Sequence, residues 1–335
     1  MFEIVPIFIG VIWIVVIIAI IVSAIKGSKR QKKRDEVYSK VKIEKAADIQ
    51  TYVNMLTNNK ELEEKRKNYK NSKLYVVLFI AIVVGVCLFF KFFHPIIIFF
   101  VIVISVITFA IANAGYTKIY KDQVITSILK NYDKDLNYMP ENGIQRNIYK
   151  IAKFEHFDRY TTEDLIVGKI CGLEFALADV HTEDESTDSD GNTTYTTLFR
   201  GPVAVVELNK LKDLVIYVSD NQLKLFRGNE YVELDNQAFE DKYDVFTNND
   251  VIAMRILTPT LTTKILEMHD KFGFFFEIKL IDGLVFFRFH SDTLFNPCPN
   301  DIEKEATDIA FYFNMLDGMK NIMEEIIKTL NEFER

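Results

Sequence analysis

The chain has 335 residues, of which 49% are hydrophobic, and its formal net charge is −7. This composition leaves room for one sizeable folded domain and additional apolar segments. The charge is distributed unevenly: residues 26–73 carry 15 basic and 7 acidic side chains, whereas residues 114–335 carry a net charge of −15. The acidic part argues against nucleic-acid binding, because neutralising phosphates requires a basic surface.

Three apolar runs predict three membrane spans. The first, residues 4–25, contains no ionisable side chain and is long enough to cross a ~30 Å hydrocarbon core at ~1.5 Å per residue. No basic residue precedes it, unlike in a signal peptide, so we expect an uncleaved anchor over residues 1–25. The next two runs begin at Leu74 and Pro95 and are together too long for one span. They predict a transmembrane helical hairpin over residues 74–113.

The segment KGSKRQKKR, residues 26–34, holds six basic side chains directly after the first run. Cytoplasmic flanks of membrane helices are enriched in Lys and Arg, and Lys118 and Lys121 follow the third run in the same way. The pattern predicts a multi-pass protein of the cell (inner) membrane, with its amino terminus outside and everything after the third span in the cytoplasm. An alternative role for residues 26–34 is binding to anionic lipid headgroups. The lipid bilayer is in either case an expected partner.

Two amphipathic stripes flank the hairpin. The basic cytoplasmic connector, residues 26–73, contains one with apolar residues at helical spacing, and residues 114–145 contain another. We expect the two to pack together as a helical stalk. The predicted spans contain no charged residue at mid-depth, so they are expected to be anchors rather than a transport pathway. The stripe residues are Ala46, Ile49, Val53 and Leu56, then Val124, Ile125, Ile128, Leu129 and Tyr132.

The rest of the chain, residues 146–335, is predicted to be an acidic α+β domain. Apolar residues alternate with period two after Gly143, as expected for strands. Hairpin turns are predicted at Asp190-Gly191, Asp220-Asn221 and Asp282-Gly283, because such pairs favour the positive φ angles of tight turns. The pattern therefore predicts an antiparallel sheet.

Two helices are predicted in this domain. Thr258 and Pro259 are typical of a helix start, and Leu261, Ile265, Met268 and Phe272 form one apolar stripe. A long C-terminal helix is predicted from about Asp301 to Phe333. Its apolar face is wide enough to pack on the sheet, and its nearly heptad spacing leaves self-association as the alternative. The predicted fold is thus α+β: an anchor, a transmembrane hairpin, and a cytoplasmic antiparallel-sheet domain with a middle helix and a long C-terminal helix.

Several sequence blocks in this domain resemble a known family. They are DRYTTEDLIVGKI from Asp158, LFRGPVAVVELNK from Leu198, FEDKYDVFTNNDVIAMRILTP from Phe239, and the hairpin at Asp282-Gly283. In this order they resemble the uncharacterised prokaryotic membrane-protein family designated domain of unknown function 3137, over roughly residues 117–297. The resemblance implies membrane helices joined to a soluble domain, an association with LemA-type membrane proteins, and no established catalytic residues.

No catalytic, cofactor-binding or metal-binding residue is assigned. The chain lacks the phosphate-binding GxxxxGK, the dinucleotide-binding GxGxxG, and the HExxH and GxSxG patterns. Cys87, Cys171 and Cys298 have the spacing of neither a disulfide framework nor a zinc site. We expect the five histidines to be surface or hydrogen-bonded residues, because none has a ligand-like spacing; they are His94, His156, His181, His269 and His290.

Two groups of charged residues are candidate sites. Residues 183–190 hold five carboxylates before Gly191, as in the start of a calcium loop, but an EF-hand register would place Thr197 where a bidentate glutamate belongs. We therefore expect residues 183–190 to form a solvent-exposed acidic hairpin tip. Cation binding by these carboxylates is the alternative. The second group is expected to be an ion-paired strand entry; it comprises Asp158, Arg159, Glu163 and Asp164.

The sequence favours a non-catalytic, membrane-anchored interaction or scaffold module. One alternative is an enzyme of unrecognised type, which a pocket with convergent carboxylates or a histidine of perturbed pKa would favour. Another is a pleckstrin-like, lipid-reading domain, an analogy of fold only. That alternative needs a local basic patch, for which the candidates are Lys210, Lys212, Lys224 and Arg227.

Overall fold

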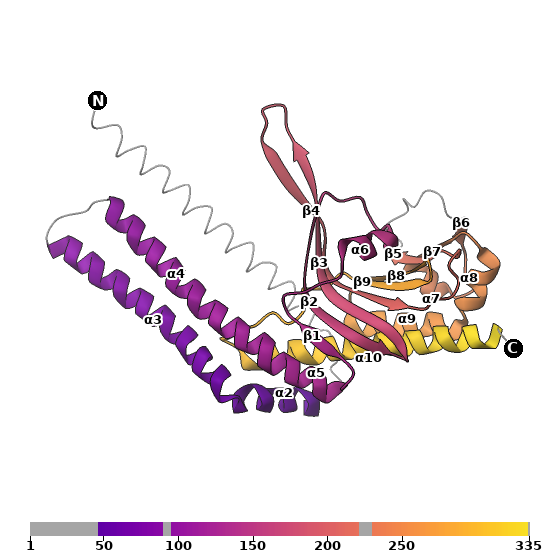
Figure 1. Ribbon diagram of the computed structural model, residues 1–335, viewed down its shortest axis with the longest axis horizontal. Helices are drawn as coiled ribbons and strands as arrows, with labels where there is room; N and C mark the ends of the chain where they lie inside the picture. Colours follow the sequence, from indigo (N-terminus) through magenta and orange to yellow (C-terminus); the bar gives the residue numbers. More distant parts are fainter. Residues whose placement is uncertain (1–45, 90–94, 221–229, 334–335) are drawn as a thin grey trace. The chain divides into compact units, whose positions relative to one another are not determined.

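The computed structural model describes residues 46–89, 95–220 and 230–333 (Figure 1). These residues form two compact units. A helical unit contains residues 46–124 and 297–306, and a sheet unit contains residues 125–296 and 307–333, within the described ranges. The predicted first span, residues 4–25, and the basic segment 26–34 lie outside the described residues.

The helical unit contains α2 (Ala46–Asn58), α3 (Lys60–Phe89) and α4 (Pro95–Ile119). The stripe of the connector does form a helix, α2, and Leu56 is buried. The charged run that follows belongs to α3, which continues without a break past residue 73, where the second span was expected to begin. The Asn59 side chain accepts a hydrogen bond from the Leu62 N–H (2.9 Å) at the helix start, and such a cap allows α3 to begin there.

Helices α3 and α4 lie side by side (Figure 1). The rings of Tyr69 and Phe109 are 5.2 Å apart, and the Lys73 ammonium lies 5.0 Å from the Tyr69 ring centre. The described residues contain two helices long and apolar enough to cross a membrane, Lys60–Cys87 and Phe99–Tyr132. The turn expected between them, residues 91–94, is not described. As predicted, helical structure continues beyond α4, through the π-helical segment η1 (Tyr120–Ile125) into α5 (Thr126–Tyr132).

Within the described ranges, the sheet unit contains one sheet of nine strands. Each pair of neighbouring strands is antiparallel. This confirms the predicted antiparallel sheet. In spatial order the strands are β1 (Asn137–Met139), β2 (Arg159–Ile170), β3 (Leu173–Thr187), β4 (Thr193–Glu207), β9 (Leu284–Phe289), β8 (Phe276–Ile281), β5 (Ile216–Asp220), β7 (Tyr243–Thr247) and β6 (Glu230–Val232).

Two of the three predicted hairpin turns are confirmed. Asp282 and Gly283 have φ angles of 54° and 74° and join β8 to β9, as a two-residue turn with positive φ at both positions requires. Gly191, with φ of 83°, lies in the turn between β3 and β4. The third turn cannot be compared, because Asp220 ends β5 and the next residue is not described.

Helices cover both faces of the sheet (Figure 1). The short helix α6 (Arg146–Ala152) lies on one face, where Tyr149 joins a cluster with Phe154 and Phe286. On the opposite face α9 (Pro259–Phe272) begins as predicted, since the Thr258 side chain accepts a hydrogen bond from the Leu261 N–H. The four residues of its stripe are buried. Two further short helices were not predicted; they are α7 (Gln237–Glu240) and α8 (Asp250–Ile256).

The long C-terminal helix α10 (Ile302–Phe333) is confirmed. Phe311 lies 5.2 Å from Phe272 of α9, ring centre to ring centre. A Cβ at Gly318 would lie 3.0 Å from the Met268 sulfur, so α9 and α10 approach closely at this glycine. Most apolar positions of α10 are buried within the chain, which is the packing predicted for this helix; its self-association stays a prediction.

The distal halves of β3 and β4 form a two-stranded arm that extends from the sheet (Figure 1). Strand β2 pairs with β3 only as far as Glu183, and β9 pairs with β4 only from Val203. Residues 184–187 and 193–196 therefore pair only with each other, and all of them are exposed. We call residues 184–196 the arm.

Gly201 is expected to tolerate no side chain. A Cβ there would lie 2.5 Å from the Phe289 carbonyl oxygen and 3.1 Å from that of Ser291. We predict that Gly201→Ala destabilises the sheet unit by about 1–3 kcal/mol, as overpacking does, measured by denaturant unfolding of the full chain in detergent with circular dichroism. Gly85→Ala is the matched control, because a Cβ at that position meets no atom within 4 Å. Equal unfolding midpoints for the two variants would contradict the prediction.

Candidate functional site

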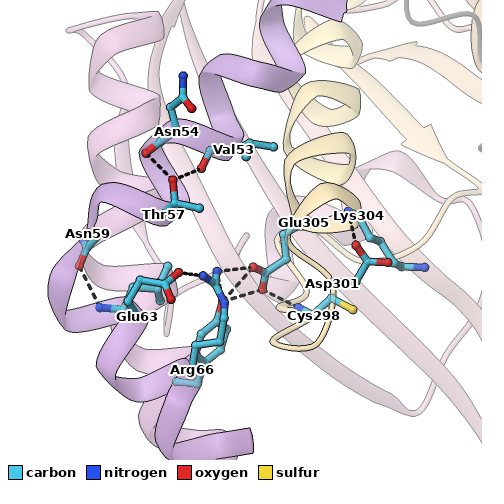
Figure 2. Close-up of polar contacts among 12 residues, drawn as sticks. Val53, Asn54, Thr57, Asn59, Glu63, Arg66, Cys298, Asp301, Lys304 and Glu305 are labelled. Atoms are coloured by element: carbon cyan, nitrogen blue, oxygen red, sulfur yellow. Dashed lines mark hydrogen bonds and ion pairs between the residues drawn. The ribbon is translucent and has the colours of Figure 1, made fainter.

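Arg66 of α3 lies in a buried polar network of the helical unit (Figure 2). Its Nη2 atom donates to Glu305 Oε2 at 3.1 Å and to the Tyr116 hydroxyl of α4 at 2.9 Å, and that hydroxyl donates to Glu305 Oε2 at 2.8 Å. Arg66 also contacts Glu63, and the Cys298 N–H donates to Glu305 Oε1 at 2.7 Å. We call Arg66, Tyr116 and Glu305 the basal network.

The basal network fastens segment 297–306 to α3 and α4. Arg66 is 1% exposed, and both Tyr116 and Glu305 are 0% exposed. Burial raises the pKa of Glu305, although the hydrogen bonds from Tyr116 and the charge of Arg66 oppose this shift. Removing one member would leave another buried polar group without its partner, which is costly in a site closed to water. Nothing in the spacing of these residues predicted their meeting.

A second network lies on the α6 face of the sheet. Arg288 of β9 contacts two carboxylates, Glu277 of β8 and Glu155 of the loop after α6. Glu277 also accepts hydrogen bonds from Tyr217 and, at 3.1 Å, from His290 Nε2. We call Arg288, Glu277 and Glu155 the central network.

Further groups complete the central network. Glu155 Oε1 accepts from the Tyr149 hydroxyl at 2.7 Å and from Thr182 Oγ1 at 3.0 Å. The Arg288 guanidinium lies 4.3 Å from the ring centre of Phe154 and 4.9 Å from that of Phe199. Each carboxylate oxygen accepts at least one hydrogen bond, so the network is paired internally, and this is how buried charge is tolerated.

The charge of Glu277 is strongly favoured. Burial opposes that charge, but the hydrogen bond from His290 and the charge of Arg288 outweigh burial and lower the pKa of Glu277 to about 2. Lys279 lies on the same face, with its ammonium 4.5 Å from the Tyr217 ring centre and hydrogen-bonded to the Lys153 carbonyl (3.2 Å). Burial lowers the pKa of Lys279 to about 8. The arrangement suits a structural role, because its polar groups are engaged with one another.

A polar pocket of about 270 Å³ lies on the opposite face of the sheet. Asp179 and His181 of β3 and Arg200 of β4 line it. His181 Nε2 lies 3.1 Å from Thr197 Oγ1. Burial, with a smaller contribution from the Arg200 charge, lowers the pKa of His181 although Glu183 opposes the shift. The imidazole is therefore mainly neutral at neutral pH. The pocket was not predicted, because its residues come from separate strands.

The predicted acidic tip is part of the arm and its turn. Asp188 Oδ1 accepts the N–H groups of Asp190 (2.9 Å) and Asn192 (2.8 Å), so this carboxylate stabilises the turn. Within the described ranges, no three His, Cys, Asp or Glu side chains are placed to hold a metal ion. Cys87, Cys171 and Cys298, all of which are described, form no disulfide bond with one another.

The predicted strand entry is only partly ion-paired. Arg159 lies 3.8 Å from Glu183, and Asp158 Oδ2 accepts the Glu185 N–H at 2.9 Å. Asp164 is instead buried, with φ of 60°, and accepts a hydrogen bond from the Tyr138 hydroxyl. Glu163 lines the polar pocket.

The histidines occupy different environments. His156 is exposed, and His269 Nδ1 lies 3.1 Å from the Tyr243 hydroxyl. His290 contacts the central network and His181 lines the polar pocket, while His94 lies outside the described residues.

Comparison with known proteins confirms the family resemblance over part of the chain. Residues 197–328 match the family described as "Protein of unknown function (DUF3137)". A solved structure of the mycobacterial trehalose monomycolate transport factor A, TtfA, is similar at 12% sequence identity and a TM-score of 0.30. The alignment covers 58% of this chain and 94% of that chain. A score this low does not establish a common fold. No curated protein matches the chain.

We predict that Glu277→Gln destabilises the sheet unit by about 3–5 kcal/mol, because Arg288 would lose a buried counter-charge. Denaturant unfolding of the full chain in detergent measures the change. Glu174→Gln is the matched control: Glu174 pairs with Lys169 at 3.3 Å, both side chains are well exposed, and such a pair contributes about 1 kcal/mol or less. A loss below about 1 kcal/mol for Glu277→Gln would show that the central network is not stabilised as described.

The pKa of Glu277 predicts a pH dependence of stability. Its folded pKa of about 2 lies below the ordinary 4.5, so its contribution is complete above about pH 4.5 and is lost as the pH falls toward 2. The free energy of unfolding, measured between pH 3 and 7, should decrease in acid less steeply for Glu277→Gln than for the wild type. Glu174→Gln should retain the wild-type slope, and parallel curves for all three proteins would contradict the assignment.

Proposed function

We propose that the protein is a non-catalytic interaction or scaffold module anchored in the cell membrane by three spans, with its amino terminus outside and its sheet unit in the cytoplasm. One observation carries this proposal. Large apolar side chains are exposed along both α3 and α4, and soluble proteins rarely expose contiguous apolar patches of this kind. They include Leu74, Val77, Ile82, Val86, Phe100, Ile104, Ile107 and Ile111.

The distribution of charge along α3 supports the bilayer as the environment of its second half. From Leu74 to Phe89 the helix carries no charged residue, while its first half is rich in Lys, Arg and Glu. The basal network, with Arg66 on the charged half, lies at the end of the apolar segment and is closed to water. Segment 297–306 is therefore fastened to α3 and α4 outside the apolar segment of α3.

The arm supports the interaction role. A two-stranded ribbon without a packed apolar face is only marginally stable in water by itself. The arm nevertheless extends from the sheet, and the side chain of Tyr195 on it is 48% exposed. The arm and its turn also carry four acidic residues, Asp184, Glu185, Asp188 and Asp190. Such a surface fits a protein partner with a basic face, by charge complementarity. Another membrane protein is the partner we propose, and a LemA-type protein is the one that the family resemblance suggests.

An enzyme is a second candidate, which the polar pocket favours. The pocket gathers two carboxylates, Glu163 and Asp179, with His181, whose pKa is lowered. The lipid-reading alternative stays a prediction. Of its four basic residues, Lys210 and Lys212 are described, while Lys224 and Arg227 lie outside the described residues.

The proposed topology predicts the side from which Cys171 reacts. Cys171 is exposed in the sheet unit, whereas Cys87 is buried in α3. In Cys298→Ser protein, a membrane-impermeant maleimide should label inverted membrane vesicles and leave intact cells unlabelled. Cys171→Ser in the same background is the control for labelling at Cys87. Labelling of Cys171 in intact cells would place the sheet unit outside and overturn the proposal.

The arm is tested by cross-linking in native membranes. A photoreactive phenylalanine at Tyr195 should capture one defined membrane protein reproducibly, as identified by mass spectrometry. Tyr231 of β6 is the matched control, because it is a tyrosine of similar exposure on another strand. Equal capture from both positions, or capture of this chain alone from Tyr195, would contradict a partner-specific role of the arm.

A further inference from the structure

The two strands of the arm have edges of different kinds. On the β3 edge, the Asp158 N–H donates to the Glu183 carbonyl at 3.0 Å, and Asp158 Oδ2 accepts the Glu185 N–H at 2.9 Å. Asp158, the residue before β2, therefore closes the β3 edge. On the β4 edge, the described pairing partners of residues 193–197 all belong to β3, and pairing with β9 begins only at Val203. We call residues 193–197 of β4 the open edge.

The hydrogen bonds of the arm show which residues of the open edge point outward. In an antiparallel pair, the N–H and C=O groups of one residue point to the same side, and this side alternates along the strand. The two residues of β3 that bond to Asp158 point away from β4, so Asp184 between them points toward its pairing partner Thr196. The outward-pointing residues of the open edge are consequently Thr193, Tyr195 and Thr197.

The sequence of the open edge lacks the features that usually protect a sheet edge. Soluble proteins place charged residues, especially Lys, or Pro on exposed edge strands, because backbone groups at an edge can pair with another chain. Residues 193–197 read TTYTT, which contains neither a charged residue nor a proline, and Thr and Tyr both favour strands. All of these residues are exposed. The open edge is therefore suited to receive a further strand.

The charge of the arm selects the kind of strand that is added. Residues 184–196 contain four acidic residues and no basic residue. Arg159 of β2 lies at the base of the arm, where its Nη1 atom is 3.8 Å from Glu183 Oε2 and its guanidinium carbon is 4.4 Å from the Tyr195 ring centre. Beyond this base the arm is acidic, so an added strand that carries Lys or Arg is complementary to it.

We propose that the arm binds its partner by strand addition, in which an extended segment of the partner, rich in Lys or Arg, pairs with the open edge. Backbone hydrogen bonds to the outward-pointing residues provide affinity, and alternate side chains of the added strand provide specificity. Tyr195, which is 48% exposed, offers an aromatic neighbour to one of these side chains. This inference rests on the proposed role of the arm in binding another membrane protein, and it specifies the segment that the partner supplies.

A synthetic peptide tests the pairing on the full chain in phosphatidylcholine nanodiscs, whose lipid has no net charge to attract it. The probe is the fluorescein-labelled heptapeptide Lys-Val-Lys-Thr-Lys-Val-Lys, and fluorescence anisotropy measures its binding. The same peptide N-methylated at its three central residues keeps its charges but lacks their N–H donors, so it should bind at least tenfold more weakly. A peptide with Glu in place of Lys should be weakened similarly. Equal affinity of the unmodified and N-methylated peptides, or no saturable binding of either, overturns the proposal.

Proline substitution locates the pairing at the open edge. Thr197→Pro removes an outward N–H and leaves the bonds between β3 and β4, because proline is tolerated where the N–H of an edge strand faces outward. It should weaken binding of the peptide at least tenfold. Thr197→Val is the matched control, since both variants lose the hydroxyl that contacts His181 and only valine keeps the N–H.

A second pair of variants, Thr193→Pro and Thr193→Val, repeats this comparison at the other end of the open edge. Circular dichroism verifies that all four variants are folded. Unchanged affinity in both proline variants, or an equal loss in the valine variants, overturns the assignment to the open edge.

Cross-linking in native membranes separates this inference from the proposed function. The photoreactive phenylalanine at Tyr195 is combined with Thr197→Pro or Thr197→Val, and mass spectrometry identifies the captured membrane protein. Loss of that protein with proline and its retention with valine support strand addition. Retention with both shows that the arm binds its partner in another way, so the inference fails while the proposed function stands. If no membrane protein is captured from the unmodified open edge, both fail.

Discussion

The pairing of β4 with β9 is the contact on which the sheet unit depends. It joins the meander β1-β2-β3-β4 to the strands β9-β8-β5-β7-β6, and it is formed by two segments about 80 residues apart in sequence. Gly201 permits close approach at one end of this seam, and Arg288 lies on it, paired with Val203. The central network depends on this pairing, because it joins Glu155, which precedes β2, to Arg288 of β9. The polar pocket depends on it as well, because its lining combines residues of β2, β3 and β4 with Thr293, which follows β9.

The unit keeps charge on both faces of a largely apolar sheet, and it does so in two different ways. The central network surrounds Arg288 with acceptors and aromatic rings, so its charges are used within the fold. The polar pocket leaves Arg200 exposed beside a fixed carboxylate. This difference separates a network whose charged groups pair with one another from a pocket whose arginine side chain is exposed to solvent. The same two strands, β3 and β4, then continue outward as the arm.

Elements with a local signal were predictable from the sequence, and elements built by long-range pairing were not. Thr258-Pro259 and the stripe after it define α9, and Asp282-Gly283 defines the turn between β8 and β9, because caps and tight turns depend on adjacent residues. The three-residue strand β1 is too short to show alternation, and α6 gives no long stripe. The first half of α3 is charged and shows no apolar stripe, so the start of this helix was not predicted from periodicity. The cap at Asn59 is the local feature that could have indicated it.

The candidate sites were missed for the same physical reason. Glu155, Glu277 and Arg288 meet across 11 to 133 residues of sequence, and no spacing rule links them. The pocket depends on a bulge and on strand register, neither of which is encoded by a single residue type. The acidic residues at 183–190 are contiguous in sequence, but in the structure Glu183 pairs with β2 while the others lie in the arm and its turn. A contiguous run of charged residues therefore predicted a solvent-exposed segment correctly. The polar residues that meet in the buried network are far apart in sequence, so no local pattern revealed them.

The basal network also sets an order of assembly. Arg66 and Glu305 are separated by 239 residues, and Tyr116 lies 189 residues before Glu305. Because a chain is made from its amino terminus, α3 and α4 are synthesised long before the carboxylate of Glu305 that pairs with Arg66. During that interval the base of the two helices retains a cation without its final partner. A chain truncated before Pro297 lacks Glu305, so the buried contacts of Arg66 and Tyr116 with this carboxylate form only after the C-terminal segment has been made.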